Sequence, residues 1–414
     1  MPIRYSCISC GREYRTDQAI YRCPSCEEAG TSAAGRVGAT GGFAKGVLVT
    51  IFDPKGKPRR GEPVNPLSFL PLPIAQMPAF PVGNTPLARP PKLLQKAGFP
   101  NLCFKLDNLN PSGSLKDRAS ILVASQAALL GEKRVALAST GNAGASMACA
   151  GAACGLEVVL FVPASAPRAK LLQSLLFGAR VVPVSGTYDQ AFSLSIEYTK
   201  ARGGINRNTA YNPLTIEGKK TVSLEIYNQL GCEAPDCVYV PAGDGVIFAG
   251  VHKGFADLVA AGLAPRVPTL VMVQAEGSNA IARSFREGRQ VVLSRASTYA
   301  DSISVASPAN GEMALDCLRK SGGRAVEVSD REIAAAQAEL AREGGIFVEP
   351  SSAAAWAGFL RDRGNVDPQA RVVVLLTGTG FKDLAAAETL VFLPAACEPR
   401  LASALETLET VYGD

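Results

Sequence analysis

Apolar residues along this chain gather in short runs that are separated by longer stretches of mixed polarity. The runs are rich in valine and leucine and are bounded by glycine, proline or polar residues, which is typical of buried β-strands. They cover Leu102–Leu106, Arg134–Ala138, Val158–Val162, Arg180–Val184, Cys237–Val240, Thr269–Val273 and Val372–Leu376. The stretches between them predict helices, among them Asp117–Leu130, Ala143–Cys154, Ala166–Phe177 and Arg331–Glu343.

The alternation of strands and helices predicts an α/β fold with parallel sheets that helices cover on both faces. There are too many such units for one small sheet, so we expect two lobes with a cleft between them. We place a larger lobe at residues 41–110 and 215–414, a smaller α/β lobe at 111–214, and an N-terminal module at 1–40. Gly46–Phe52 is a further strand-like run within a segment rich in Gly, Pro and Ala that extends from about Gly30 to Gly83.

Composition and charge exclude several classes of protein. The chain has 414 residues, of which 47% are hydrophobic and 19% charged, as in soluble globular proteins. Its net charge of +5 is spread over 42 basic and 37 acidic residues without a basic tract, so nothing indicates binding to nucleic acid or to a membrane surface. The first residues lack a hydrophobic signal region, and the cysteines number eleven, an odd count that argues against a disulfide framework. We expect a cytoplasmic protein.

Four of the cysteines form two Cys-x-x-Cys pairs near the N-terminus. Cys7 and Cys10 make the first pair, and Cys23 and Cys26 make the second. A Cys-x-x-Cys turn points two thiolates at one ion, and two such turns complete a tetrahedral site that is usually structural zinc. The pattern predicts a zinc-ribbon-like module that either binds zinc or has lost it. A redox role is disfavoured, because no thioredoxin-like sequence surrounds either pair.

The first motif with chemical potential is Asn110-Pro-Ser-Gly-Ser-Leu-Lys116-Asp-Arg, which follows a predicted strand. It predicts a turn with Lys116 in the first turn of the next helix. The positive end of a helix dipole disfavours a cation, so this position helps to keep the amine of Lys116 neutral. A neutral amine is what Schiff-base chemistry needs, although a surface lysine is an equally simple interpretation of this motif alone.

A second motif, Ala138-Ser-Thr-Gly-Asn142-Ala-Gly, also lies between a predicted strand and a helix. Backbone N–H groups and hydroxyls at a helix N-terminus bind anions, and a substrate carboxylate is a good candidate. An ordinary helix cap on Ser139 or Thr140 would explain one hydroxyl but not the whole cluster.

A third motif, Pro241-Ala-Gly243-Asp-Gly245-Val-Ile, is a glycine-rich turn before a helix and is suited to holding a phosphate with backbone donors. Asp244 is an unusual neighbour for a phosphate. Its carboxylate either points away or accepts a hydrogen bond from a helix N–H group. A glycine-rich turn by itself is weak evidence.

A fourth motif, Leu376-Thr377-Gly-Thr-Gly, ends a predicted buried strand. Ligands bind at the carboxyl ends of parallel strands, so Thr377 is a candidate binding residue. A plain glycine-rich turn between a strand and a helix is the alternative.

These motifs in this order resemble those of the fold-type II pyridoxal 5′-phosphate (PLP) enzymes, and most of all those of the threonine synthases. The resemblance covers nearly the whole chain and includes the two cysteine pairs, the lysine motif, Ala138-Ser-Thr-Gly-Asn142, Glu349-Pro-Ser-Ser and Thr377-Gly-Thr-Gly. It implies a two-lobed fold-type II PLP lyase that acts on an amino acid, and it implies a homodimer.

The resemblance also implies a role for each motif. Lys116 would hold PLP as a Schiff base and would remove the proton from the substrate Cα, while PLP absorbs the developing negative charge. Asn142 would contact the 3′ oxygen of the cofactor and Thr377 its pyridine nitrogen. The phosphate loop and the substrate-carboxylate loop would consist respectively of Gly243, Asp244, Gly245, Val246 and Ile247, and of Ser139, Thr140 and Ala143.

Two features depart from the threonine synthase pattern. An arginine is common two residues after an Asn-Pro pair in that family, but here Thr215 follows Asn212-Pro-Leu. Arg207, Lys219 and Lys220 are the nearby cations that could replace it. The glycine loop Gly243-Asp-Gly is also shorter and more acidic than the usual Gly-Asn-x-Gly-Asn.

Three functional hypotheses follow. The first is threonine synthase, which converts O-phospho-L-homoserine and water into L-threonine and phosphate. The second is a serine/threonine dehydratase-like ammonia-lyase, or a related β-replacement enzyme, that acts on a non-phosphorylated amino acid. The third is a non-catalytic sensor that keeps the fold, which is disfavoured because Lys116, Asn142 and Thr377 are all present. The only histidine, His252, is expected to be structural, so lysine must carry the proton transfers.

Overall fold

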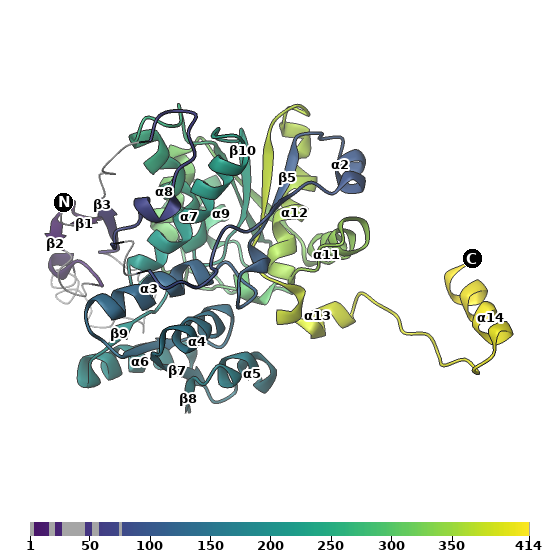
Figure 1. Ribbon diagram of the computed structural model, residues 1–414, viewed down its shortest axis with the longest axis horizontal. Coiled ribbons are helices and arrows are strands. Elements are labelled where there is room, and N and C mark those ends of the chain that lie inside the picture. The colour runs from purple at the N-terminus through teal and green to yellow at the C-terminus, as the bar shows by residue number, and fades with distance from the viewer. Residues whose placement is uncertain (1–3, 16–20, 27–45, 52–57, 74–76, 414) are drawn as a thin grey trace.

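Two parallel sheets form the body of the protein (Figure 1). The computed structural model describes residues 4–15, 21–26, 46–51, 58–73 and 77–413. The predicted N-terminal module at 1–40 and the predicted strand Gly46–Phe52 therefore lie partly outside the described residues. The predicted strands from residue 102 onward are all present, and their bounds differ from the prediction by no more than two residues.

The larger sheet has six strands in the order β12-β11-β10-β13-β5-β4. Five are parallel, and the two-residue β4 adds an antiparallel edge beside β5. In that order the strands are Arg324–Val328, Thr269–Ala275, Cys237–Pro241, Val372–Leu376, Leu102–Leu106 and Leu87–Ala88. The smaller sheet has the order β8-β7-β6-β9 and is wholly parallel. Its strands are Arg180–Val184, Glu157–Pro163, Arg134–Ala138 and Ile205–Asn206.

Helices cover both faces of the sheets. Those that surround the smaller sheet or lead to it are α3 (Asp117–Leu129), α4 (Asn142–Cys154), α5 (Arg168–Leu176) and α6 (Tyr188–Arg202). The remaining helices are α2 (Pro91–Ala97), α7 (Leu214–Gln229), α8 (Val246–Ala260), α9 (Ala280–Arg286), α10 (Gly311–Lys320), α11 (Asp330–Gly344), α12 (Pro350–Asp362), α13 (Leu384–Glu388) and α14 (Leu401–Tyr412). In Figure 1, α14 stands apart from the body at the end of an extended segment.

The strand β13 shows why the central strands are apolar throughout. Val373 and Leu375 pack into the core that includes residues of α7 and α8, while Val372, Val374 and Leu376 pack into the core beneath α11 and α12. Successive side chains of a strand point to opposite faces, so a strand with helices on both sides needs apolar residues at every position. The predicted α/β fold with helix-covered parallel sheets is confirmed.

A separate antiparallel sheet carries the N-terminal cysteines. It has the order β2-β1-β3, with β1 at Arg4–Cys7, β2 at Glu13–Arg15 and β3 at Leu48–Ile51. Because β3 lies beyond residue 40, this sheet includes residues that the sequence assigns to the larger lobe. The lobe boundaries at 110/111 and 214/215 stay a prediction.

Among the described residues, no helix is both long and apolar enough to cross a membrane.

Arg118, in the first turn of α3, is buried at the centre of a network of charges. Its guanidinium donates to both carboxylate oxygens of Asp107 at 2.6 and 2.8 Å and to those of Glu225 at 2.5 and 2.7 Å. Lys105 of β5 donates to the same Glu225 at 2.7 Å. Burial raises the pKa of Glu225, but Arg118 and Lys105 outweigh it and lower the pKa to about 2. The network joins β5, α3 and α7 to the 3₁₀ turn Asp107–Leu109.

Replacing Arg118 by Met would leave Asp107 and Glu225 buried without this counter-charge, and should lower the free energy of unfolding by about 3–5 kcal/mol. The control is Arg134→Met, since Arg134 pairs with Glu157 in a partly exposed position. That change should cost less than about 1 kcal/mol. Urea unfolding followed by fluorescence measures both, and an Arg118→Met loss as small as that of the control would contradict the role of the network.

Candidate active site

Lys116 lies between the turn Asp107–Leu109 and α3, where it is the N-cap residue rather than part of the first helical turn. The backbone on its N-terminal side is hydrogen-bonded to the loop after β13. Leu115 N donates to Thr377 O at 2.9 Å, and Thr379 N donates to Gly113 O at 3.0 Å. The structure therefore brings Lys116 and Thr377 to the same edge of the larger sheet.

Asp117, the next residue, fixes the turn of the lysine motif. The backbone N–H and the hydroxyl of Ser112 donate to its carboxylate at 2.7 and 2.5 Å. Burial raises the pKa of Asp117, and the two bonds from Ser112 only partly offset this effect. Asp117 thus acts as the anchor of the Pro-Ser-Gly-Ser turn that presents Lys116.

The loop after β6 holds Ser139, Thr140 and Ala143, which are all half-buried. The hydroxyl of Ser139 accepts hydrogen bonds from the N–H groups of Gly141 and Gly144, at 3.3 and 3.0 Å. Ser139 therefore caps the first turn of α4. This is the ordinary helix cap that the sequence offered as the alternative to an anion site. No hydrogen bond joins the Thr140 hydroxyl to another described group.

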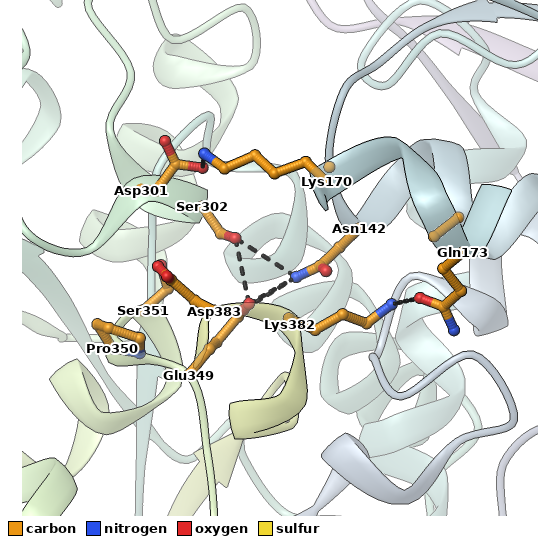
Figure 2. A pocket seen from close by; sticks show the side chains of 12 residues that line it. Asn142, Lys170, Gln173, Asp301, Ser302, Glu349, Pro350, Ser351, Lys382 and Asp383 are labelled. Carbon is orange, nitrogen blue, oxygen red and sulfur yellow. Dashed lines mark hydrogen bonds and ion pairs between the residues drawn. The ribbon is translucent and has the colours of Figure 1, made fainter. Parts of the chain in front are cut away.

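Asn142, the first residue of α4, faces a carboxylate from the other lobe. Its Nδ2 donates to both side-chain oxygens of Glu349 at 3.0 and 2.9 Å, and Ser302 Oγ lies 3.4 Å away (Figure 2). Glu349 is almost completely buried at the N-terminus of α12. A Cβ on Gly378 would lie 2.4 Å from Glu349, so this approach requires a glycine at 378. The sequence shows the motif around Glu349 but not this contact.

A pocket of about 40 Å³ lies beside Asn142, between residues of α4 and α5 and residues of the larger lobe. Lys170 and Asp301 form an ion pair of 2.8 Å across it, and the ammonium of Lys382 donates to Gln173 (Figure 2). A volume of this size holds about one water molecule.

The glycine loop Gly243-Asp-Gly245 begins α8, and Gly245 has the left-handed backbone conformation at φ 89°. Asp244 Oδ1 accepts a hydrogen bond from Val246 N at 3.0 Å, so the acidic side chain bonds a helix N–H group. The N–H groups of Ile247 and Phe248 have no acceptor among the described residues. They point along the axis of a 15-residue helix at its positive end, which is an anion-binding arrangement.

Arg207, Lys219 and Lys220 are the cations that could replace an arginine at position 215, and their surroundings differ. Lys220 pairs with Glu217 and Asp257 at 2.7 Å each. Arg207 and Lys219 are both buried, and neither forms an ion pair within the described chain.

His252 lies in α8 with Lys320, Asp316, Lys253 and Asp257 as its charged neighbours, none of which is a candidate site residue. Burial lowers its pKa to about 4, and Lys320 adds to this effect. The imidazole is therefore neutral near pH 7 and lies away from the candidate catalytic groups, in agreement with a structural role.

The four N-terminal cysteines come together as the sequence predicts. Their sulfur atoms all lie within 4.8 Å of one another. The distance is 3.7 Å between Cys7 and Cys26 and 3.6 Å between Cys10 and Cys23. A tetrahedral site with metal–sulfur bonds of about 2.3 Å has sulfur atoms about 3.8 Å apart, so the cluster has the dimensions to hold a metal ion.

Comparison with known proteins identifies the family. Residues 79–378 match the family model described as pyridoxal-phosphate dependent enzyme. The chain belongs to this family. It is a threonine synthase-like PLP-dependent lyase of fold type II, as the resemblance in sequence implied.

Several relatives support this assignment. A threonine synthase from Methanosarcina acetivorans is 34% identical over 389 residues, which cover 91% of each chain. One from Synechocystis is 36% identical over 73% of this chain and 77% of its own. Among solved structures, a threonine deaminase from T.th. has a TM-score of 0.63 and 25% identity, and the match covers 72% of this PLP enzyme and 92% of the deaminase.

The residues of this PLP enzyme fit the cofactor. Lys116 supplies the amine, and the N-terminus of α8 offers N–H groups without acceptors for a phosphate. Arg207 Nη2 is a buried donor without an acceptor, which is a further sign of an anion-binding site. The motifs in the sequence single out Lys116, the glycine loop and Thr377, and their roles stay predictions. The motif at Glu349 is also visible in the sequence but received no role, and Ser302 and Lys382 were missed, because nothing in the sequence shows that these residues converge across the two lobes.

Proposed function

We propose that this enzyme is a threonine synthase, which converts O-phospho-L-homoserine and water into L-threonine and phosphate. The observation that carries the proposal is the length of the match. The threonine synthases of Methanosarcina acetivorans and Methanocaldococcus jannaschii each match 91% of this chain, which is more than the PLP family region 79–378. The threonine deaminase structure matches only 72%.

In this proposal Lys116 is the catalytic base. It would hold the cofactor as a Schiff base, and once the substrate amine has displaced it from that bond, its free Nζ would take the proton from the substrate Cα. PLP, when bound, supplies an electron sink for the negative charge that develops at Cα.

The remaining predicted residues orient the ligands. Thr377 offers a neutral hydroxyl to the pyridine nitrogen, which suits elimination and replacement better than transamination. Asn142 contacts the 3′ oxygen, and for this its amide must give up part of its contact with Glu349. The loop of Gly243, Asp244, Gly245, Val246 and Ile247 holds the cofactor phosphate.

The substrate carboxylate is assigned to the loop after β6. Ser139, Thr140 and Ala143 are half-buried at the N-terminus of α4, so backbone N–H groups there are within reach of an anion. Ser139 Oγ accepts two N–H bonds, which leaves its O–H free to donate, so the hydroxyls of Ser139 and Thr140 can both donate to a carboxylate.

A dehydratase-like ammonia-lyase, or a β-replacement enzyme on a non-phosphorylated amino acid, is the second candidate. Position 215 favours it. Thr215 is fully buried and its hydroxyl donates to Asn212 O at 2.7 Å, so it offers no group to a substrate phosphate. Membership of an enzyme family argues against the non-catalytic sensor.

A product assay separates the two candidates. The PLP-loaded enzyme is given O-phospho-L-homoserine, L-threonine and L-serine in parallel, and phosphate, threonine and 2-oxo acid are measured. We expect threonine and phosphate in equal amounts from phosphohomoserine. Formation of 2-oxo acid from serine or threonine, without turnover of phosphohomoserine, would replace the proposal by the ammonia-lyase.

We also propose that Cys7, Cys10, Cys23 and Cys26 bind one structural zinc ion, supported by the sulfur–sulfur distances given above. Elemental analysis of protein that is purified without chelators should find one zinc per chain. Cys23→Ser should lose most of it, because this buried thiolate has no replacement in the cluster. Cys232→Ser, outside the cluster, is the control. A wild-type chain free of metal after growth with added zinc would refute the site.

The homodimer and the cytoplasmic location stay predictions from the sequence.

A further inference from the structure

Two buried cations outside the predicted site, Arg207 and Lys219, interact electrostatically with Asp244 of the glycine loop. Arg207 follows β9, where its backbone N–H donates to Ala136 O at 2.9 Å, so it lies at the carboxyl edge of the smaller sheet. Lys219 lies in α7 against α8, with its Cβ 2.8 Å from where a Cβ on Gly250 would be. The two helices are packed closely enough here that a glycine is needed at position 250.

Each of the two side chains has a nitrogen without an acceptor among the described residues. Arg207 Nε donates weakly to Ser120 Oγ at 3.3 Å and Nη1 donates to Thr209 Oγ1 at 2.6 Å, but Nη2 is buried without any acceptor. Lys219 makes no hydrogen bond with a described residue. Its neighbour Lys220, by contrast, has two carboxylates at 2.7 Å.

The electrostatics show a surplus of positive charge. Burial lowers the pKa of Lys219 to about 7, with smaller contributions from Arg207 and Lys116 and against the opposite effect of Asp244. Burial likewise lowers the pKa of Arg207 to about 10, again against Asp244. The carboxylates that act on these cations are already engaged, since Asp244 accepts a bond from Val246 N and Asp117 accepts two bonds from Ser112.

Such a surplus is unfavourable in the unliganded protein. A buried charge without a partner costs several kcal/mol, so buried cations are normally paired or bind an anion. The guanidinium fork matches the oxygens of a phosphate, and an ammonium adds a compact charge. The N–H groups of Ile247 and Phe248 lie at the start of the same helix against which Lys219 packs.

We propose that Arg207 and Lys219 bind the phosphate of a phosphate monoester at the N-terminus of α8. Their positive charges offset the negative charge of Asp244. If the ester is the substrate, they also replace the arginine that threonine synthases commonly have where this chain has Thr215. The phosphate belongs either to the cofactor or to the substrate. Only the second case rests on the proposed threonine synthase activity, whereas the first needs only the PLP family.

The test uses Lys219→Met and Arg207→Met, with Lys219→Arg as the charge-conserving variant and Lys200→Met, on the exposed face of α6, as the control. Apoprotein is titrated with PLP and with pyridoxal, which lacks the phosphate. Holoenzyme is titrated with O-phospho-L-homoserine and with L-homoserine, and the cofactor absorbance reports binding. Thermal unfolding of each apoprotein is measured as well.

We expect each Met variant to bind one phosphate ester about 10- to 100-fold more weakly, with no change for the matching ligand without phosphate. A loss confined to PLP assigns the cofactor phosphate, and a loss confined to phosphohomoserine assigns the substrate phosphate. Lys219→Arg should keep most of the affinity. Apoprotein with Lys219→Met should melt no lower than wild type, because a buried charge without a partner has been removed.

Two outcomes would overturn the proposal. One is an equal loss of affinity for phosphorylated and unphosphorylated ligands, which would show a structural role. The other is unchanged affinity for both esters. If phosphohomoserine is not turned over but PLP affinity still falls in the Met variants, the phosphate site stands and the threonine synthase proposal fails.

Discussion

The buried guanidinium of Arg118 is the constraint on which the position of Lys116 depends. It is held by Asp107 in the turn after β5 and by Glu225 in α7, and it lies only two residues after the lysine. The start of α3 is thereby fixed between the central sheet and α7. The same helices approach closely, since a Cβ on Gly218 of α7 would lie 2.1 Å from Arg118 O. Charge pairing and a glycine contact together set where the amine of Lys116, the proposed catalytic base, is attached.

The two sheets then complete the site from opposite sides. The edge of the larger sheet presents Lys116, Thr377 and the N-terminus of α8, which is a set of groups at the carboxyl ends of parallel strands. The smaller sheet contributes the loop after β6 and the buried Arg207 after β9. The bond between Asn142 and Glu349 and the ion pair between Lys170 and Asp301 join the two lobes beside the pocket.

Much of this arrangement follows from local sequence. The apolar strand β13 and the glycine loop before α8 are visible because periodicity and turn chemistry act over a few residues. Three features were not predictable. The two-residue strands β4 and β9 are too short to show a period. In α7 the charges of Lys219 and Glu225 would be typical of an exposed face, yet both are buried, because their environment comes from other helices. The contact of Asn142 with Glu349 joins residues that are 207 positions apart.

The central claim is that Lys116, and no other lysine, carries the cofactor. Lys219 is the strongest competitor, since its pKa of about 7 makes it a good neutral amine near the same loop. Reduction of the PLP-loaded enzyme with borohydride, followed by digestion and peptide mass spectrometry, decides between them. The account predicts a phosphopyridoxyl group on the peptide that contains Lys116. The same group on the peptide that contains Lys219 would contradict it.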